Sequence, residues 1–353
     1  MKHPNWVVLQ ITERCNLRCK MCYEWGENGA YKSRENLHDL SIGKIEEVFS
    51  DLKEYSVYYE LFGGEPLLHP QFSEIMQLVK KYECKIDIPT NGTLLSKYSK
   101  EIVDAKVRRI WISLDGPEQI NDLQRGKGVY KKATEGIKTI QEYKRLKNST
   151  YPLIGVTFVL TPLNYMYLKD FVVNELLKLN LDYISIEFQL YLTPERYDKY
   201  LVYLSEKLNV ESETVASGLI RDISDFNNID LDILNKDLCE VRRIIKENGI
   251  KRIGYPHYID TENLNYFYSG KWDLMKESKS YCPFPWVYME VAANGDVTPC
   301  HTFYDFKMGN IYSNRILEIW NNINYSNFRK TTRKEITPLC CACSRYYNLP
   351  EDK

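Results

Sequence analysis

The sequence predicts an α/β protein built on a parallel sheet. Short apolar runs alternate with segments whose apolar residues recur at helical spacing, and this alternation continues through residues 6–190. Successive strand–helix units of this kind form parallel sheets with right-handed crossovers. Polar, glycine-rich motifs directly follow several of the apolar runs. Since ligands bind at the carboxyl ends of the strands in such sheets, we expect these motifs to form one site.

Each element is predicted from its own pattern. The predicted strands are residues 6–11, 57–62, 85–89, 110–114, 154–160 and 183–190. Helices are expected where apolar residues line one face, which gives residues 42–52 after a Ser41 cap, 72–79, 129–140 and 168–179. The sequence therefore predicts six strand–helix units.

Three thiols follow the first predicted strand. Cys15, Cys19 and Cys22 have the spacing C-x3-C-x2-C, and no fourth cysteine lies nearby. Three thiolates can hold three corners of a 4Fe–4S cluster and leave one iron open. An open metal position is typical of a catalytic site. The alternative is a structural zinc site, but such sites usually show two paired ligand clusters at short spacing.

This cysteine stretch resembles the radical SAM family. In that family the open iron chelates S-adenosylmethionine (SAM), and one electron cleaves its sulfonium to a 5′-deoxyadenosyl radical. The resemblance implies a partial (β/α)6 TIM-like barrel, with SAM and a 4Fe–4S cluster as cofactors. It also implies an external one-electron reductant of the flavodoxin or ferredoxin type. The six predicted strands agree with this fold.

Further motifs extend the resemblance. Gly63, Gly64, Glu65 and Pro66 follow the second strand and resemble the family's GGEP motif, which binds the methionyl amino group of SAM. The alternative is a simple turn before a helix. His69, which follows the motif, is expected to be structural.

The next two strands end in polar residues that the resemblance places near SAM. Asn91 follows the third strand, beside Gly92 in a turn. Ser113 and Asp115 end the fourth strand and suit the ribose, although Asp115 also suits a turn or helix cap. Arg125 resembles the arginine that binds the SAM carboxylate in members with a SPASM or twitch extension.

The sequence divides into three predicted domains. Residues 1–192 form the barrel, 193–280 a helical bridging or substrate lobe, and 281–353 an auxiliary domain. Cys84 and Cys239 are expected to be buried apolar residues, and hydrogen donation to a substrate radical is the less favoured alternative. Glu187 and Gln189, near the end of the sixth strand, are expected to face the site.

The C-terminal domain is predicted to hold a second metal centre. A hairpin signalled by Asn294-Gly295 brings together Cys282 and Cys300. The remaining thiols, Cys340 and Cys343, have C-x2-C spacing and complete a closed site.

This pattern resembles a SPASM or twitch-like extension. Since no cysteine follows Cys343, we expect a truncated form with one auxiliary 4Fe–4S cluster. Cys341 is an alternative to Cys340 as a ligand, and His301 is expected either to hydrogen-bond a sulfur or to lie on the surface. A zinc ribbon on the same four thiols is the alternative site.

Composition excludes several classes of protein. The 353 residues have a net charge of −1, so no global field attracts nucleic acid or anionic membranes. No signal peptide or membrane span is evident. Ten cysteines in such a chain indicate metal binding in a cytoplasmic protein.

Together these features predict a radical SAM enzyme. It would abstract a hydrogen atom from an unactivated C–H of a small, possibly sugar-like substrate, leading to oxidation or epimerisation. A peptide substrate, epimerised or cross-linked, is the alternative. It is less favoured because no upstream domain for a leader peptide precedes the first strand. The alternative of another class is a non-catalytic iron–sulfur or zinc scaffold. No catalytic acid, base or hydrogen donor follows from the sequence.

Overall fold

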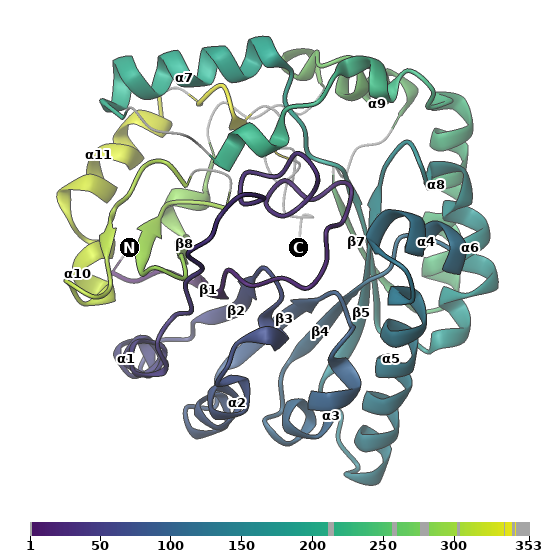
Figure 1. Cartoon of the computed structure of the whole chain (residues 1–353), viewed down its shortest axis with the longest axis horizontal. Helices are drawn as coiled ribbons and strands as arrows, with labels where there is room; N and C mark the ends of the chain where they lie inside the picture. Colours follow the sequence, from purple (N-terminus) through teal and green to yellow (C-terminus); the bar gives the residue numbers. More distant parts are fainter. Residues whose placement is uncertain are drawn as a thin grey trace.

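One continuous sheet organises the molecule. The computed structural model describes residues 2–210, 215–255, 260–275, 282–301, 304–334, 336–340 and 343. Within them, ten strands form a single sheet in the order β10-β9-β8-β1-β2-β3-β4-β5-β6-β7. Figure 1 shows the parallel strands as an open arc with helices outside it. The predicted α/β partial barrel is therefore confirmed.

The six predicted strands are all present. They are β1 (Trp6–Thr12), β2 (Tyr58–Gly63), β3 (Lys85–Thr90), β4 (Arg109–Ser113), β5 (Leu153–Leu160) and β6 (Tyr183–Phe188). Each pairs in parallel with the next. The pairing of β1 with β2 shifts register between Gln10 and Thr12, where the chain enters the cysteine loop. All six carboxyl ends therefore meet at one edge, as expected.

Helices cover the outer face of these strands. They are α1 (Ile42–Leu52), α2 (Phe72–Lys81), α3 (Leu95–Asp104), α4 (Glu118–Arg125), α5 (Val129–Leu146) and α6 (Leu168–Asn174), with short 3₁₀ turns at Pro66–Leu68, Tyr165–Tyr167 and Leu176–Leu179. Neither α3 nor α4 was predicted from the sequence. On the buried face of α3, the apolar pattern is interrupted by Ser99. That hydroxyl is satisfied inside the helix by donating to the Leu95 carbonyl (2.7 Å).

The predicted middle lobe is partly a continuation of the barrel. It contains α7 (Pro194–Leu208), α8 (Leu231–Glu247), β7 (Lys251–Tyr255) and α9 (Thr261–Tyr268), with 3₁₀ turns at Val215–Leu219, Ile223–Phe226 and Trp272–Leu274. β7 pairs in parallel with β6, so α8 and β7 add a seventh strand–helix unit. The sequence also predicts a strand over residues 250–259, interrupted by Pro256. β7 is present through Tyr255, and residues 256–259 lie outside the described part.

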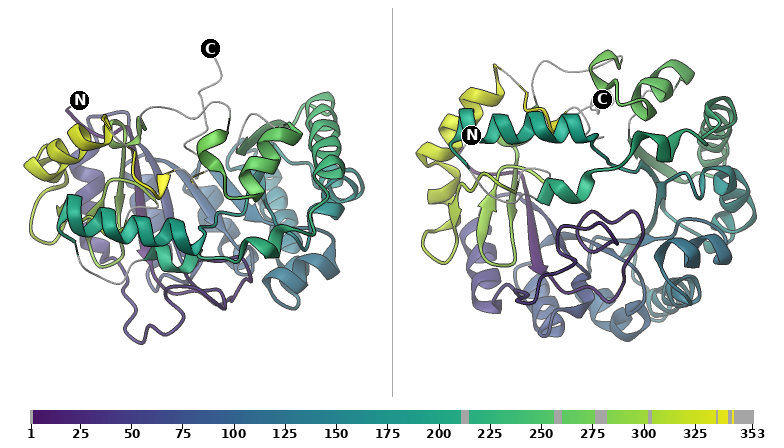
Figure 2. Two further views of the ribbon diagram at one scale, coloured as in Figure 1. Left: turned by 90° about the horizontal axis from the view of Figure 1, so that it is seen from above. Right: turned by 45° about the horizontal axis from the view of Figure 1, so that its top comes forward.

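The C-terminal domain extends the other edge of the sheet. It contains β8 (Tyr288–Val291), β9 (Asp296–Thr298), β10 (Gly309–Asn310), α10 (Ile316–Trp320) and α11 (Ile323–Thr332), after a 3₁₀ turn at Phe284–Trp286. The predicted β8–β9 hairpin is confirmed, with Gly295 at φ +86°. β8 also pairs in parallel with β1, which sequence analysis did not foresee. Figures 1 and 2 place α10 and α11 beside β8 and β9, at the opposite end of the sheet from α6 and α8.

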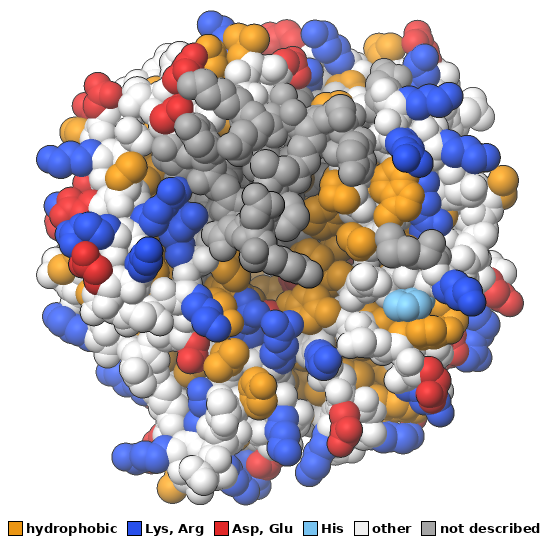
Figure 3. All heavy atoms as spheres, turned by 180° about the vertical axis from the view of Figure 1, so that it is seen from behind, with side chains coloured by type: hydrophobic (Ala, Val, Ile, Leu, Met, Phe, Trp, Pro, Cys, Tyr) orange, Lys and Arg blue, Asp and Glu red, His pale blue; other side chains and the backbone are white. Residues whose placement is uncertain are grey.

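The surface agrees with the near-zero net charge. Figure 3 shows basic and acidic side chains both distributed around the rim of one face, with apolar side chains nearer its centre. Among the described residues, no helix combines the length and apolarity needed to cross a membrane.

Candidate functional site

A cavity of about 420 Å³ occupies the barrel interior. It extends from loops at the carboxyl ends of the strands down to Trp6, Tyr58 and Arg109, which are the first residues of β1, β2 and β4. The predicted site residues that line it are Cys15, Cys19, Cys22, Gly63, Gly64, Glu65, Pro66, Asn91, Ser113 and Arg125. Glu187 and Gln189 line it as well. The structure therefore brings together all the predicted residues of the first 192 except Asp115.

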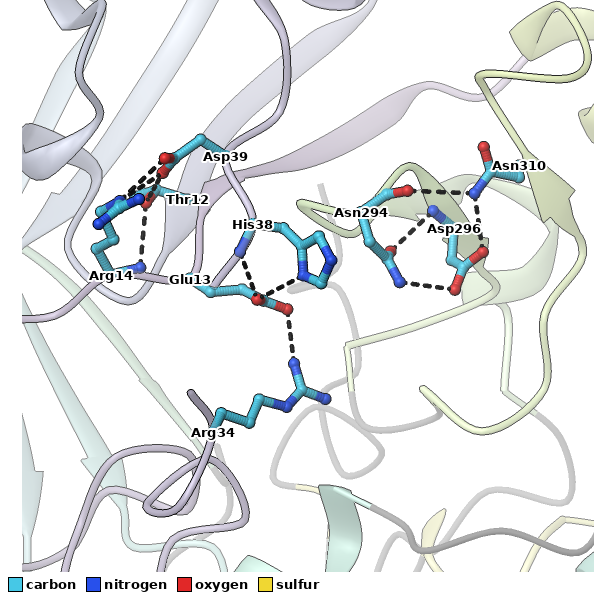
Figure 4. Close-up of polar contacts among 9 residues, drawn as sticks. All are labelled: Thr12, Glu13, Arg14, Arg34, His38, Asp39, Asn294, Asp296 and Asn310. Carbon is cyan, nitrogen blue, oxygen red and sulfur yellow. Dashed lines mark hydrogen bonds and ion pairs between the residues drawn. The ribbon is translucent and has the colours of Figure 1, made fainter. Parts of the chain in front are cut away.

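Hydrogen bonds and an ion pair fix the start of the cysteine loop. Thr12 Oγ1 donates to Asp39 Oδ1 (2.6 Å), and the buried Glu13 pairs with Arg34 (2.6 Å) and accepts from the His38 backbone N–H (2.8 Å). Figure 4 shows these contacts between the loop and the segment before α1. The same figure shows the Asn294–Asp296–Asn310 contacts that hold the β8–β9 turn. The loop therefore leaves β1 in one defined direction.

The interior of the loop is tightly wound. Gly26 N donates to the Cys22 carbonyl (3.1 Å), and Trp25 N donates to Cys22 Sγ (3.3 Å). A Cβ on Gly26 would lie 2.3 Å from that carbonyl oxygen and 2.8 Å from the Cys19 carbonyl oxygen. Only glycine therefore fits at this close approach.

The three thiols suit an iron–sulfur cluster. Burial raises the pKa of Cys15 to about 12, that of Cys22 to about 11 and that of Cys19 above its usual value. Thiolates form in such surroundings when a metal compensates their charge. Within the described ranges, no three Cys, His, Asp or Glu side chains converge on the position of a single metal ion. Three thiolates of a four-iron cluster bind three different irons, so such a cluster does not require them to converge on one position.

The two glycines of the GGEP motif lie against the cysteine loop. Gly63 has φ +140°, and a Cβ there would lie 2.1 Å from the Thr12 carbonyl oxygen. A Cβ on Gly64 would lie 2.4 Å from the Arg14 carbonyl oxygen. Backbone hydrogen bonds join the same segments, from Gly64 N to Thr12 (2.9 Å) and from Glu65 N to Arg14 (2.7 Å). The motif therefore packs backbone to backbone on the stem of the loop.

Glu65 joins the ends of β2 and β3. It is 1% exposed and accepts hydrogen bonds from Thr90 Oγ1 (2.7 Å), Asn91 N (2.7 Å) and Leu67 N (3.2 Å). Burial raises its pKa to about 7, against the opposing effect of these donors. Asn91 Nδ2 in turn donates to Asn16 Oδ1 in the cysteine loop (3.0 Å). The motif residues thus form one connected support for that loop.

Asp115 lies behind Arg125 rather than on the cavity wall. It is fully buried, accepts from Val159 N (2.8 Å) and Gln124 Nε2 (2.7 Å), and pairs with Arg125 Nε (2.6 Å). Burial opposes the charge on Arg125, but Asp115 together with Cys19 and Cys22 outweighs this effect and raises the pKa of Arg125. Direct contact of Asp115 with a ribose does not fit this position, because Asp115 has no exposed surface and does not line the cavity. Asp115 instead orients the Arg125 guanidinium toward the cysteine loop.

Sequence analysis missed the polar residues deeper in the barrel. Asp87 on β3 forms a buried ion pair with Arg109 on β4 (3.3 Å), and Trp111 Nε1 donates to Asp87 (3.3 Å). All three line the cavity. Their signal was present, because they alternate with buried Ile88 and Ile110, and alternation places them on the inner face.

The C-terminal cysteines lie in separate segments of the chain, and Cys340 and Cys343 share one of them. Cys343 N donates to the Cys340 carbonyl (3.1 Å), and Thr337 Oγ1 lies 3.2 Å from Cys340 Sγ. Burial raises the pKa of Cys340 to about 11. Burial and Asp305 raise the pKa of Tyr200, and charges on Cys300 and Cys340 add to this. Cys282 precedes β8, whose hairpin leads to Cys300, whereas Cys341 lies outside the described residues.

Sequence analysis also named four further residues, which are Cys84, Cys239, His69 and His301. Cys84 packs against the core, whereas Cys239 is exposed on α8, so the expected burial of Cys239 is wrong. Neither lines the cavity, so hydrogen donation there is not supported. His69 is structural as predicted: it accepts from Gln71 N (3.1 Å) and lies 3.0 Å from the Leu40 carbonyl. His301 contacts the Tyr23 hydroxyl.

Comparisons with known proteins match both halves of this arrangement. Residues 9–159 match the radical SAM superfamily model, and residues 282–344 match SPASM, an iron–sulfur cluster-binding domain. The chain is 27% identical to the tungsten-containing aldehyde ferredoxin oxidoreductase cofactor-modifying protein of Pyrococcus furiosus, over 96% of this chain and 87% of that protein. It is 34% identical to the GTP 3′,8-cyclase of Peptoclostridium acidaminophilum, over 39% of this chain and 42% of the cyclase.

Solved structures share the fold. Streptococcus suis SuiB bound to SAM has a TM-score of 0.65 at 17% identity, covering 93% of this chain and 68% of SuiB. The anSMEcpe structure with bound AdoMet has a TM-score of 0.63 at 15% identity, covering 97% of this chain and 87% of that one. The cysteine loop and the cavity motifs through Arg125 lie in the first matched range, and the second begins at Cys282. The chain therefore carries a radical SAM superfamily domain followed by a C-terminal SPASM domain, and these two domains imply SAM, a 4Fe–4S cluster and auxiliary iron–sulfur as the cofactors of a radical SAM enzyme.

Proposed function

We propose that this enzyme abstracts a hydrogen atom from an unactivated C–H of a small molecule, leading to its oxidation or epimerisation. The observation that supports this most strongly is the continuity of the cavity. One space is lined by the three-thiol loop, by Arg125 and by polar residues deep in the barrel. SAM and the cluster, when bound, supply the 5′-deoxyadenosyl radical. A substrate in the same cavity would meet that radical away from solvent.

In this proposal each residue has a defined task. Cys15, Cys19 and Cys22 would hold the cluster, and the Arg125 fork would bind the SAM carboxylate. The backbone of Gly63-Gly64-Glu65-Pro66 would bind the amino group, and Ser113 and Asn91 would contact the nucleoside half. In the second domain, Cys282, Cys300, Cys340 and Cys343 would hold the auxiliary cluster.

The relatives in sequence favour a small substrate. The relative that aligns with nearly the whole chain is named for modifying a cofactor, and the cyclases are named for acting on GTP. A structure of SuiB with its precursor peptide has a similar fold, but at 16% identity this likeness supports the fold alone. A peptide substrate is therefore the second candidate.

A label-transfer experiment distinguishes the two. Cells of the source organism grown in deuterated medium supply a small-molecule fraction and a peptide fraction with non-exchangeable C–D bonds. Each is incubated anaerobically with reconstituted enzyme, SAM and dithionite, and 5′-deoxyadenosine is analysed by mass spectrometry. We expect a gain of one mass unit with the small-molecule fraction. Gain with the peptide fraction alone would assign a peptide substrate, and no gain with either would contradict hydrogen abstraction.

A further inference from the structure

Two residues that directly follow predicted cluster ligands contact each other. Tyr23 follows Cys22 in the N-terminal loop, and His301 follows Cys300 in the C-terminal domain. Tyr23 Oη lies 2.9 Å from His301 Nε2, and the two rings meet edge to face at 6.1 Å. Both residues line the cavity. This contact therefore joins two metal-binding segments that are 278 residues apart in sequence.

A buried carboxylate holds the histidine. Glu290 on β8 has no exposed surface and lies 3.5 Å from His301 Nδ1. Three other side chains donate hydrogen bonds to its carboxylate, which are Gln10 Nε2 (2.8 Å), Tyr288 Oη (2.6 Å) and Tyr304 Oη (3.0 Å). A carboxylate beside Nδ1 favours a proton on that nitrogen. Nε2 is then left to accept the hydrogen bond from the Tyr23 hydroxyl.

The tyrosine is also held on its backbone side. Ala30 N donates to the Tyr23 carbonyl (2.9 Å), and a Cβ on Gly218 would lie 1.9 Å from that carbonyl oxygen. The phenol end is fixed by His301 and the backbone end by these neighbours. A displacement of His301 would therefore be passed to the segment that contains Cys22.

We infer that the Tyr23–His301 hydrogen bond couples the C-terminal domain to the SAM-binding loop, with His301 as a positioning residue for Cys22. The inference rests on the proposed function in assigning the two cysteine sets to clusters. It deepens that function by making the SPASM domain a regulator of SAM binding. Since coupling is reciprocal, the state of either domain affects the other's ligand.

Holoenzyme variants test this coupling. Tyr23→Phe and His301→Ala each remove the hydrogen bond and should weaken SAM binding roughly fivefold by isothermal titration. The double variant should match the single variants, about fivefold, instead of multiplying to about 25-fold. His301→Gln retains an acceptor and should restore much of the affinity. Each variant should also change the electron paramagnetic resonance (EPR) spectrum of the reduced, SAM-bound N-terminal cluster.

Tyr312→Phe is the matched control. Its hydroxyl accepts a hydrogen bond from Ser41 N (3.2 Å), so it also joins the C-terminal domain to the barrel, but outside the cavity. We expect wild-type SAM affinity from it. If His301→Ala loses the auxiliary iron, Tyr23→Phe still tests the inference, because both cysteine sets are intact.

Several outcomes would overturn the coupling. These are unchanged affinity in Tyr23→Phe, effects that multiply in the double variant, or equal weakening by Tyr312→Phe. Failure of the proposed function gives a different result. Wild-type enzyme would then bind SAM with the affinities above yet transfer no label from substrate.

Discussion

A Cys15→Ala variant should form no 5′-deoxyadenosine above background. Loss of an outer-shell partner of a metal ligand typically costs 10- to 100-fold in metal affinity or activity, so loss of the ligand itself should cost more than about 100-fold. Cys15 lines the cavity and is one of three cysteines in its loop. Since the predicted cluster needs all three thiolates, no other cysteine in the loop can replace it. The measurement is chromatography of 5′-deoxyadenosine after anaerobic reconstitution with dithionite and SAM.

The chain offers a matched control for this change. Cys239 is also a free thiol but is exposed on α8 and does not line the cavity. Cys239→Ala should therefore retain wild-type SAM cleavage. Equal, substantial product from Cys15→Ala and wild type would contradict the assignment of the cluster to the cysteine loop. Absence of product from both proteins would favour a scaffold that does not cleave SAM.

An Arg125→Gln variant should bind SAM far more weakly. Hydrogen bonds to charged groups contribute about 1.5–3 kcal/mol, which corresponds to roughly 10- to 150-fold in Kd. Arg125 is buried, lines the cavity and is oriented by Asp115, so its guanidinium is positioned to bind a carboxylate. Asp115→Asn should also weaken SAM binding, because it removes the charge that orients Arg125. Isothermal titration of reconstituted enzyme measures both.

Arg108→Gln is the control for the arginine change. Arg108 is partly exposed beside β4, contacts the Tyr58 ring and does not line the cavity. Its loss should leave the SAM Kd unchanged. Wild-type affinity in Arg125→Gln would contradict the assignment, and so would an Asp115→Asn variant with undiminished affinity, since Asp115 would then have no effect through Arg125.

The sequence predicted features that depend on local pattern. Strands β1–β6 have apolar runs of the right length, and the motif residues follow from their position directly after a strand. Gly63 and Gly64 were predicted as part of a motif, but only the structure shows why both residues must be glycine. Both are needed where the backbone meets Thr12 and Arg14.

The features that sequence analysis missed depend on contacts between distant segments. Asp115 is a polar residue at the end of a strand, and this position suits contact with a ligand as well as it suits a structural role. Only the packing of α4 shows that its oxygens are taken by Gln124 and Arg125. The contact between Tyr23 and His301 depends on the parallel pairing of β1 with β8, and no local pattern specifies that register.

The central claim is that the polypeptide leaves one iron of the N-terminal cluster open for SAM. The most direct test is EPR and electron–nuclear double resonance on the reduced holoenzyme with and without SAM labelled with ¹⁵N at its amino group. We expect SAM to change the spectrum of one cluster and the ¹⁵N nucleus to couple to that cluster. An unchanged spectrum without ¹⁵N coupling would show a cluster fully bound by protein, and the proposed chemistry would have no starting point.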